Sequence, residues 1–461
     1  MRLSENREWV EVEDQSTAAA VAIPVPPIGL DETVLRKSKS RWADALGWMK
    51  KASYAVTDQG LVAGSNFVLG ILLARWLSPG QYGAYALGFS VYLLLVLLYQ
   101  SLVSEPMVIF GGSTYRNALR GYLKKLLGIH GGFAVVSFVV LGASAVVAHL
   151  MHQPDGLPGA LAGTAIAAPC ILLLWLVRPA FYLHSTVGYS ALGSFVYCSI
   201  LLSSLYTVYH FGYLSAFTAF LMMGFAAAIT GAFLLFRMRG TLKGTEQPPS
   251  LRIIWHKHWT YGRWALAGCI AGWLPAYVYY PLLSAFHGTA NAGELKALMN
   301  FDLPIQHAYG AISIVLMPYA ARMRMETGKK NLSKIAWTII VVFFLAACAY
   351  WALIIPFRGP IFHVLYSDKY NGVTYLLPIL ALESVFSAAL YGPGIMLRSM
   401  ESPISVFWAR SAASAVSLTL GIVGTRTFGL QGALWTMVLS AIAALSVAMV
   451  ILRRKLRLLS S

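Results

Sequence analysis

The sequence predicts an all-α polytopic membrane protein, with about twelve transmembrane helices in two six-helix lobes around a central cavity. Of its 461 residues, 58% are hydrophobic and 11% are charged, whereas soluble domains carry about twice that charged fraction. Apolar runs of roughly 20 residues, long enough to cross the hydrocarbon layer as helix, recur between short polar stretches. The runs are continuous rather than alternating with period two, which favours helices over a β-barrel.

Twelve apolar runs follow one another along the chain. They cover residues 56–77, 83–104, 126–149, 158–180, 189–210, 213–236, 264–286, 297–320, 335–357, 371–396, 404–424 and 430–452. The polar stretch 237–263 separates the first six runs (56–236) from the last six (264–452), so we expect two lobes joined by a basic cytoplasmic linker.

The two halves contain one short internal echo. LARWLSPGQYGAYAL and LLSAFHGTANAGELKAL resemble each other at an offset of 210 residues, and Gly83 or Gly293 opens the helix that follows. Six plus six spans with a central linker is the layout of transporters built from parallel repeats, whose substrate sites lie between the two lobes.

The net charge of +17 is distributed unevenly. If the amino terminus is cytoplasmic, most of the 35 Lys and Arg residues fall on that side of the predicted spans, and the exceptions are Arg75, Lys296, Arg358, Lys369 and Arg426. This asymmetry is the positive-inside signature. We therefore expect both termini in the cytoplasm, and no nucleic-acid partner.

The two ends of the chain are polar. Residues 1–55 are expected to be a disordered cytoplasmic tail that ends in a short amphipathic helix, SRWADALGWMKK, at the membrane surface. A solvated lead-in to the first span is the alternative. Residues 453–461 are expected to be a basic cytoplasmic tail.

Cofactor and catalytic motifs are not visible. The four cysteines lie inside predicted spans without ligand spacing, so we expect neither disulfides nor a metal site. The sequence contains no GxxxxGK[ST] motif, and we expect no cofactor. The predicted outer connections are too short to form an extracytoplasmic catalytic domain, so an enzyme is not expected.

Polar residues mark one side of the first span. Asp58 and Ser65 lie within about 20° of each other around a helix, and Asn66 is offset by about 80°. Such groups in a membrane usually face a bundle interior or a wet cavity. Asp58 is a candidate cation or proton site, with an interfacial acid as the alternative, and Asn66 is a candidate cavity or interhelical hydrogen-bonding residue. Gly60 and Gly64 predict close approach of another helix.

The eighth and tenth spans contain the other intramembrane acids. The residues on one face of the eighth span are Asp302, Gln306, Tyr309 and Ser313. Pro304, between the first two, predicts a break in the backbone hydrogen bonds. We expect this face to line a path for water or substrate, with a satisfied packing network as the alternative. Glu383 lies well inside its span and is, like Asp302, an ion-coupling candidate.

Four arginines are candidate anion-binding groups, because the guanidinium fork matches phosphate oxygens. Three of them, Arg178, Arg398 and Arg410, lie toward predicted cytoplasmic helix ends, where positive-inside anchoring explains each one equally well. Arg75 lies on the predicted outer side, where it could bind a diphosphate or extend to lipid headgroups.

The stretch DQGLVAGSNFVLGILLARWLSPGQYGAYAL (58–87) contains an LLAR-L-SP turn. It resembles the first helix and first turn of bacterial polysaccharide repeat-unit flippases, the Wzx-like branch of the multidrug/oligosaccharidyl-lipid/polysaccharide (MOP) exporter superfamily. SEPMVIF, the cationic helix end at Arg178 and GIVGTRTFGLQGALWTMVLSA are also similar to it, and the hydropathy pattern matches over nearly the whole chain.

This resemblance implies alternating access in the bacterial inner membrane, with an undecaprenyl-diphosphate-linked oligosaccharide as cargo. It also implies membrane lipids, a polysaccharide polymerase and a chain-length regulator as partners. By the resemblance, Arg75 and Arg178 meet the diphosphate, whereas Asp302 and Glu383 have no clear counterpart. Two alternatives remain open: a drug or organic-cation antiporter of the same superfamily, and a scaffold of a polysaccharide assembly complex that transports nothing.

Overall fold

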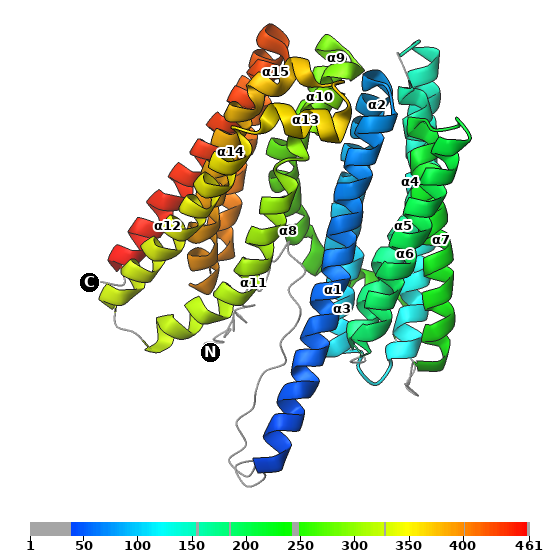
Figure 1. Ribbon diagram of the computed structural model, residues 1–461. Coiled ribbons are helices and arrows are strands. Elements are labelled where there is room, and N and C mark those ends of the chain that lie inside the picture. The colour runs from blue at the N-terminus through cyan, green and yellow to red at the C-terminus, as the bar shows by residue number, and fades with distance from the viewer. Residues whose placement is uncertain are drawn as a thin grey trace, which may run out of the picture.

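The structure is a computed structural model that describes residues 38–153, 156–183, 186–241, 249–326, 329–400 and 402–458. Regular structure within these residues is helical (Figure 1). The start of α1 (Ser38–Trp76) and the end of α15 (Pro403–Leu458) lie at the same end of the bundle. This is the predicted cytoplasmic end, and the opposite end is the predicted outer end.

The first half of the chain forms one group of helices. After α1 they are α2 (Pro79–Tyr99), the π-helix η2 (Gln100–Ser104), α3 (Glu105–Gly112), α4 (Leu119–Leu150), α5 (Leu157–Leu183), α6 (Val187–His210) and α7 (Ala216–Thr241).

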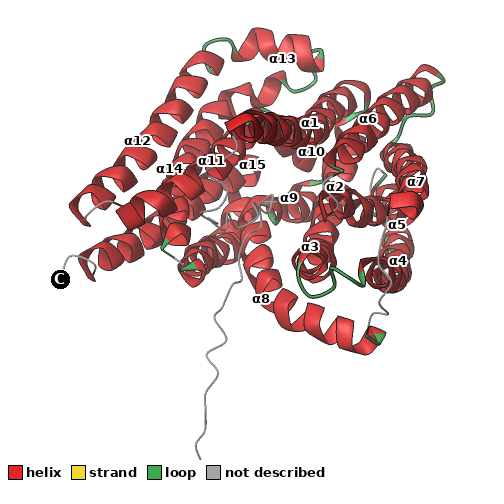
Figure 2. Cartoon of the chain, turned by 90° about the horizontal axis from the view of Figure 1, so that it is seen from below, coloured by secondary structure: helices red, strands yellow, loops and turns green. Residues whose placement is uncertain are grey.

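The second half forms the other group. Before α15 they are α8 (Leu251–Tyr277), α9 (Tyr279–His287), α10 (Thr289–Met299), α11 (Leu303–Glu326), α12 (Lys329–Ile354), α13 (Arg358–Tyr366), the 3₁₀-helix η3 (Asn371–Leu376) and α14 (Leu377–Ser399). Seen from the predicted cytoplasmic end, α11, α12, α14 and α15 lie on one side and α4 to α7 on the other (Figure 2).

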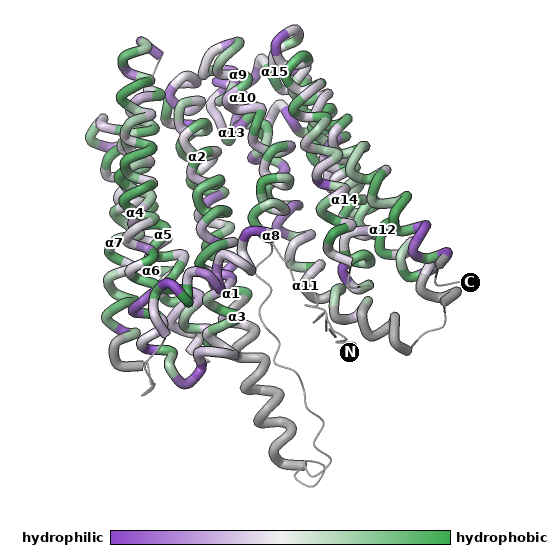
Figure 3. The backbone as a smooth tube through the Cα atoms, turned by 180° about the vertical axis from the view of Figure 1, so that it is seen from behind, coloured by the Kyte–Doolittle hydropathy of each residue, from purple (hydrophilic) through white to green (hydrophobic). Residues whose placement is uncertain are grey.

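The chain is a multi-pass membrane protein. Within the described ranges, nine helices are long and apolar enough to cross a membrane, or ten if the pair α8 and α9, bent by 40°, counts as one span. Large apolar side chains are exposed on the bundle surface, as Val135 and Val139 of α4 are at 64% and 57%. In Figure 3, hydrophobic residues predominate along α4 and α7.

The count of nine or ten candidate spans does not confirm the predicted total of twelve, which stays a prediction. The count above treats α15 as one helix, although Gly429 (φ 56°, ψ −135°) divides it into two arms. The eighth predicted span is broken into α10 and α11 before Pro304, as the proline predicted. Neither α10 nor α11 is among the helices counted above.

Two predicted boundaries differ from the structure. The helix expected at the membrane surface is continuous with the first span, because α1 runs without interruption from Ser38 to Trp76. The second part of the expected linker is also ordered, because α8 begins at Leu251. There, the Tyr122 hydroxyl lies 2.6 Å from Nε2 of His258, which attaches the first turns of α8 to α4.

The two groups are joined most closely at the predicted outer end, where α2 packs against α10. A Cβ at Gly83 would lie 1.7 Å from the Thr289 carbonyl oxygen, and a Cβ at Gly293 would lie 2.6 Å from the Pro79 carbonyl oxygen. The glycines of the sequence echo therefore meet each other across the interface, and only glycine permits backbones to approach so closely.

The hydrophobic cores follow the same division. The largest cluster of buried side chains combines the first group with α9, α10, α13, η3, the first turns of α14, single residues of α8 and α12, and the second arm of α15. A separate cluster is confined to α11, α12, α14 and the two arm ends of α15 near the predicted cytoplasmic end. The second half of the chain is thus continuous with the first at the outer end and has its own core farther in.

Candidate functional site

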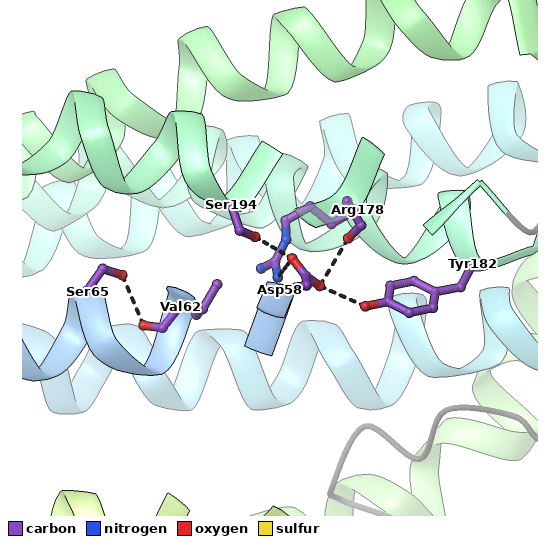
Figure 4. A network of polar contacts seen from close by, with 7 residues as sticks. Asp58, Val62, Ser65, Arg178, Tyr182 and Ser194 are labelled. Atoms are coloured by element: carbon purple, nitrogen blue, oxygen red, sulfur yellow. Dashed lines mark hydrogen bonds and ion pairs between the residues drawn. The ribbon is translucent and has the colours of Figure 1, made fainter. Parts of the chain in front are cut away.

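The first half of the chain encloses Asp58 in a complete hydrogen-bonded shell (Figure 4). Asp58 is 1% exposed, and the Arg178 Nη2 donates to its Oδ1 over 2.7 Å. Tyr182 and Ser190 donate to Oδ2 over 2.8 and 3.1 Å, and Ser194 donates to Oδ1. The shell connects α1, α5 and α6, and it neutralises both charges.

This arrangement changes the interpretation of two predicted site residues. Asp58 does not pair with an interfacial lysine, and Arg178 is not an isolated cation, because each is the other's ion-pair partner. A buried pair of this kind is costly to separate, since removing one partner leaves an uncompensated charge. The structure therefore gives Asp58 and Arg178 a structural role in positioning three helices.

The remaining polar residues of the first span have weaker partners. Ser65 is buried and its hydroxyl donates to the Val62 carbonyl within α1, whereas the half-buried Asn66 makes no hydrogen bond within the described part of the chain. The prediction that another helix approaches closely at Gly60 and Gly64 is wrong, because no atom lies within 4 Å of a Cβ built at either position. That side of α1 has room beside it.

The second half of the chain contains two acids near each other, Asp302 directly before α11 and Glu383 on α14. Asp302 is 1% exposed and accepts hydrogen bonds from Ser384 and Gln306. The half-buried Glu383 accepts one from Ser387 over 2.6 Å, and its carboxyl group interacts electrostatically with that of Asp302. Neither acid forms an ion pair with a cation of the described ranges.

The predicted polar face of the eighth span is only partly correct. Gln306 is exposed, but Tyr309 is 3% exposed and belongs to the inner core of the second half. Its ring packs against Phe343 and Tyr391, so it does not line a path for water or substrate. Helices α12 and α14 cover this side of α11, which the sequence of α11 alone does not indicate.

Two arginines converge in the second half. Arg398 lies in the last turn of α14, Arg410 lies in the third turn of α15, and their charges are close enough to repel each other. Neither forms an ion pair with an acid of the described residues, and the buried Arg398 Nε has no hydrogen-bond partner there. A Cβ at Gly394, one turn before Arg398, would meet open space.

One face of α14 carries one member of each pair, Glu383 and Arg398. Glu383, Ser387, Tyr391 and Arg398 lie within about 80° around α14. Tyr391 stands between the two pairs and is within electrostatic range of both acids and both arginines. On the far side, the Arg410 guanidinium Nη1 lies 3.3 Å from the position of a Cβ at Gly272 of α8.

Arg75 binds the other half of the protein at the predicted outer end. Its Nη1 donates to the Val364 carbonyl in the last turn of α13 over 2.8 Å, while the Lys369 ammonium donates to the carbonyls of Arg75 and Leu77. Each cation therefore caps the carboxyl end of a helix in the opposite half, where the helix dipole favours positive charge.

Sequence reasoning did not identify Asn300 and Lys296 as site residues. Asn300 is buried at the outer interface, where its amide donates to the hydroxyls of Tyr82 and Tyr366 and so connects the two halves. Lys296 is 7% exposed, and its ammonium lies 4.7 Å from the Phe89 ring centre. A signal for Lys296 was present, because it is one of the exceptions to the charge asymmetry.

The ranges that the structure describes contain no group of three or more His, Cys, Asp or Glu residues that could hold a metal ion. The four cysteines are free thiols.

Comparisons with known proteins support the fold. No protein-family model matches the chain, and no curated protein sequence matches it. A structure described as the inward-facing conformation of a multidrug resistance MATE family transporter of the MOP superfamily overlaps it with a TM-score of 0.74 at 14% identity, over 87% of this chain and 95% of that one.

Two further solved structures have the same fold. The lipid II flippase MurJ in an inward closed conformation gives a TM-score of 0.68 at 10% identity, covering 87% of each chain. An outward-facing conformation of a MATE family transporter gives 0.58 at 14% identity, over 88% of this chain and 97% of that one. The chain thus has the fold of MOP superfamily transporters, and its helices overlap the inward-facing arrangement more closely.

Proposed function

We propose that this protein is a MOP superfamily transporter that moves a polyprenyl (undecaprenyl) diphosphate-linked oligosaccharide from the cytoplasmic to the outer leaflet of a bacterial inner membrane. The cargo would serve the synthesis of a surface polysaccharide such as O-antigen or exopolysaccharide. The observation that carries this proposal is the convergence of Arg398 and Arg410 without an acid partner in the described residues.

A diphosphate suits this pair of cations. Two guanidinium groups that repel each other are stabilised by an anion placed between them, and each offers a planar fork of donors to phosphate oxygens. The unpartnered Nε of Arg398 and the open space at Gly394 leave room for such contacts. The diphosphate is therefore proposed to bind beside α14 and α15.

The family resemblance had favoured Arg75 and Arg178 for this role. Arg178 already neutralises Asp58, and Arg75 caps α13 at the outer end, so each has a protein partner. We therefore transfer the headgroup role to Arg398 and Arg410, which form no ion pair with a described residue. Arg75 is proposed instead to hold the outer end closed while the site is open toward the cytoplasm.

The acid pair supplies a candidate coupling site. Asp302 and Glu383 lie within electrostatic range of Tyr391, as both arginines do, and neither acid forms an ion pair with a described residue. Two neighbouring carboxyl groups favour sharing a proton or binding a cation. We propose that an ion bound there is exchanged during the cycle, and that a polymerase and a chain-length regulator receive the product.

A drug or organic-cation antiporter is the second candidate. The same unpaired acids favour it, because an organic cation could bind Asp302 and Glu383 directly. The two functions differ in which pair of residues holds the cargo: the arginines for a diphosphate, the acids for a cation.

The test is transport in proteoliposomes. A fluorescent polyprenyl-diphosphate oligosaccharide and a fluorescent organic cation are assayed in parallel with the wild type, Arg398→Gln and Arg410→Gln. Arg426→Gln is the matched control, because Arg426 is exposed near the opposite end of the first arm of α15.

The flippase proposal is supported if the wild type transfers the lipid-linked sugar and if Arg398→Gln and Arg410→Gln slow this transfer. Arg426→Gln should leave the rate unchanged. Movement of the cation alone overturns it in favour of the antiporter. Movement of neither cargo favours the scaffold.

A further inference from the structure

Lys296 is a buried cation for which the described part of the protein provides no anion. The residue is 7% exposed, and its ammonium forms no ion pair and no hydrogen bond with a described residue. The ammonium lies over the ring of Phe89 on α2, in the other half of the chain. A charge withdrawn from water usually has an anionic partner or lies where a ligand brings one.

The position of Lys296 is fixed by the tightest contact between the two halves. Gly293 lies one turn before Lys296 on α10, and Gly83 lies less than two turns before Phe89 on α2. Because the two glycine backbones touch, α10 cannot rotate away from α2 without separating this contact. Asn300, one turn after Lys296, is held by Tyr82 and Tyr366. The ammonium is therefore held at a set point between the halves.

Aromatic rings extend from this point in two directions. On α2, the Phe89 ring lies 5.5 Å from that of Tyr92. On α8, the Trp273 indole donates to the carbonyl of Ser90, the residue next to Phe89, and its ring stacks on Tyr277 with centres 6.0 Å apart. Phe89, Trp273 and Tyr277 are all partly exposed.

These contacts connect Lys296 with the proposed diphosphate site. Trp273 follows Gly272, against which the Arg410 guanidinium lies, and Arg410 is within electrostatic range of Arg398. A ligand bound at Arg398 and Arg410 could thus extend along Trp273 toward Lys296. The two ends of this path differ in chemistry: a pair of planar guanidinium groups at one, and a single ammonium beside aromatic rings at the other.

We propose that Lys296 binds a carboxylate on the carbohydrate part of the cargo, so that the protein prefers an oligosaccharide containing an acidic sugar. Partly exposed aromatic rings present flat apolar faces of the kind on which the C–H face of a sugar ring packs. A single ammonium is suited to one carboxylate, whereas the guanidinium pair is suited to the diphosphate. This inference rests on the proposed function and names the substrate class more closely.

The experiment compares two lipid-linked cargoes that carry the same polyprenyl diphosphate. One has a neutral oligosaccharide, and the other has the same oligosaccharide with one hexose replaced by the corresponding hexuronic acid. Initial transfer rates in proteoliposomes give kcat/KM for each cargo with the wild type, Lys296→Met and Lys296→Arg. Trp273→Leu is included as a control for packing against the sugar.

We expect the wild type to favour the acidic cargo about tenfold, as one charge-assisted hydrogen bond would give. Lys296→Met should abolish this preference while keeping transfer of the neutral cargo, and Lys296→Arg should keep part of the preference. Trp273→Leu should slow both cargoes by a similar factor, because it removes a surface that both sugars share.

Other outcomes overturn the inference without affecting the proposed function. An equal loss of both cargoes in Lys296→Met would assign Lys296 to the diphosphate or to packing of the halves. Equal rates for the two cargoes with the wild type would mean that no carboxylate is recognised. If the wild type moved neither cargo, the proposed function itself would fail.

Thermal unfolding gives an independent readout. Since methionine keeps the apolar stem of Lys296 and removes a buried charge, Lys296→Met should unfold at the same temperature as the wild type or a higher one. A clearly lower unfolding temperature would show that the protein itself supplies a partner for the ammonium, and would overturn the inference.

Discussion

Asp58 and Asp302 are equally buried, each with 1% of its surface exposed, but their surroundings differ. Asp58 accepts hydrogen bonds from four side chains, and one of them is the guanidinium of Arg178. Asp302 accepts two from neutral groups and has another carboxyl group, Glu383, as its charged neighbour. The first half of the chain neutralises its acid with an arginine, whereas the acids of the second half form no ion pair within the described ranges.

The largest expected effect is a loss of stability when the ion pair of Asp58 is removed. Arg178→Ala leaves the carboxylate of Asp58 buried without a cation, and we expect it to lower the free energy of unfolding by about 3 kcal/mol. Unfolding of the purified protein in detergent measures this loss. The double variant Asp58→Asn with Arg178→Met should recover most of it, because both charges are then removed; wild-type stability of Arg178→Ala would contradict the structural role.

Asp302→Asn should have the opposite profile. An amide keeps a similar shape and can still bond Ser384 and Gln306, so we expect a change in unfolding free energy of less than about 1 kcal/mol. Transport should lose its dependence on an imposed proton or cation gradient, because the site can no longer change its charge. Flux across vesicles with and without a gradient measures this, and a gradient response equal to that of the wild type would count against the coupling role.

The arginine pair should affect affinity rather than stability. Arg398→Gln and Arg410→Gln should each raise the KM for the lipid-linked cargo about tenfold, equivalent to about 1.4 kcal/mol. Their unfolding should be unchanged or slightly improved, since each variant relieves the repulsion between the two cations. If either variant were as unstable as Arg178→Ala, that arginine would have an acidic partner within the protein, which would contradict its role in binding the cargo.

The smallest effect is expected at the exposed acid Asp368, which serves as a surface control. The His363 imidazole beside it, with Asn371, holds the pKa of the Asp368 carboxyl below its usual range. A lowered carboxyl pKa contributes stability above about pH 4 that is lost as the pH falls through the folded-state pKa. Asp368→Asn should thus unfold at a slightly lower temperature than the wild type at pH 7, and the difference should shrink as the pH falls below about 4. The effect is small because solvent screens exposed pairs.

The membrane class and the succession of helices follow from the sequence because they depend on local properties. Continuous apolar runs must form helices in lipid, where every backbone polar group needs an internal partner. The break at Pro304 was predictable for the same local reason, because proline cannot donate a backbone hydrogen bond. The echo that places Gly83 and Gly293 at equivalent positions was also visible, although its meaning was not.

The pairing of these groups was decided by the tertiary structure. Asp58 and Arg178 are 120 residues apart in the chain, and only the packing of α1 against α5 and α6 makes one neutralise the other. The same holds for Tyr309, which neighbouring helices cover, and for Lys296, which a glycine contact holds between the halves. The sequence determines which side chains are charged, but contacts between distant segments determine their partners. Those contacts decide whether a charge is neutralised within the protein or can bind a ligand.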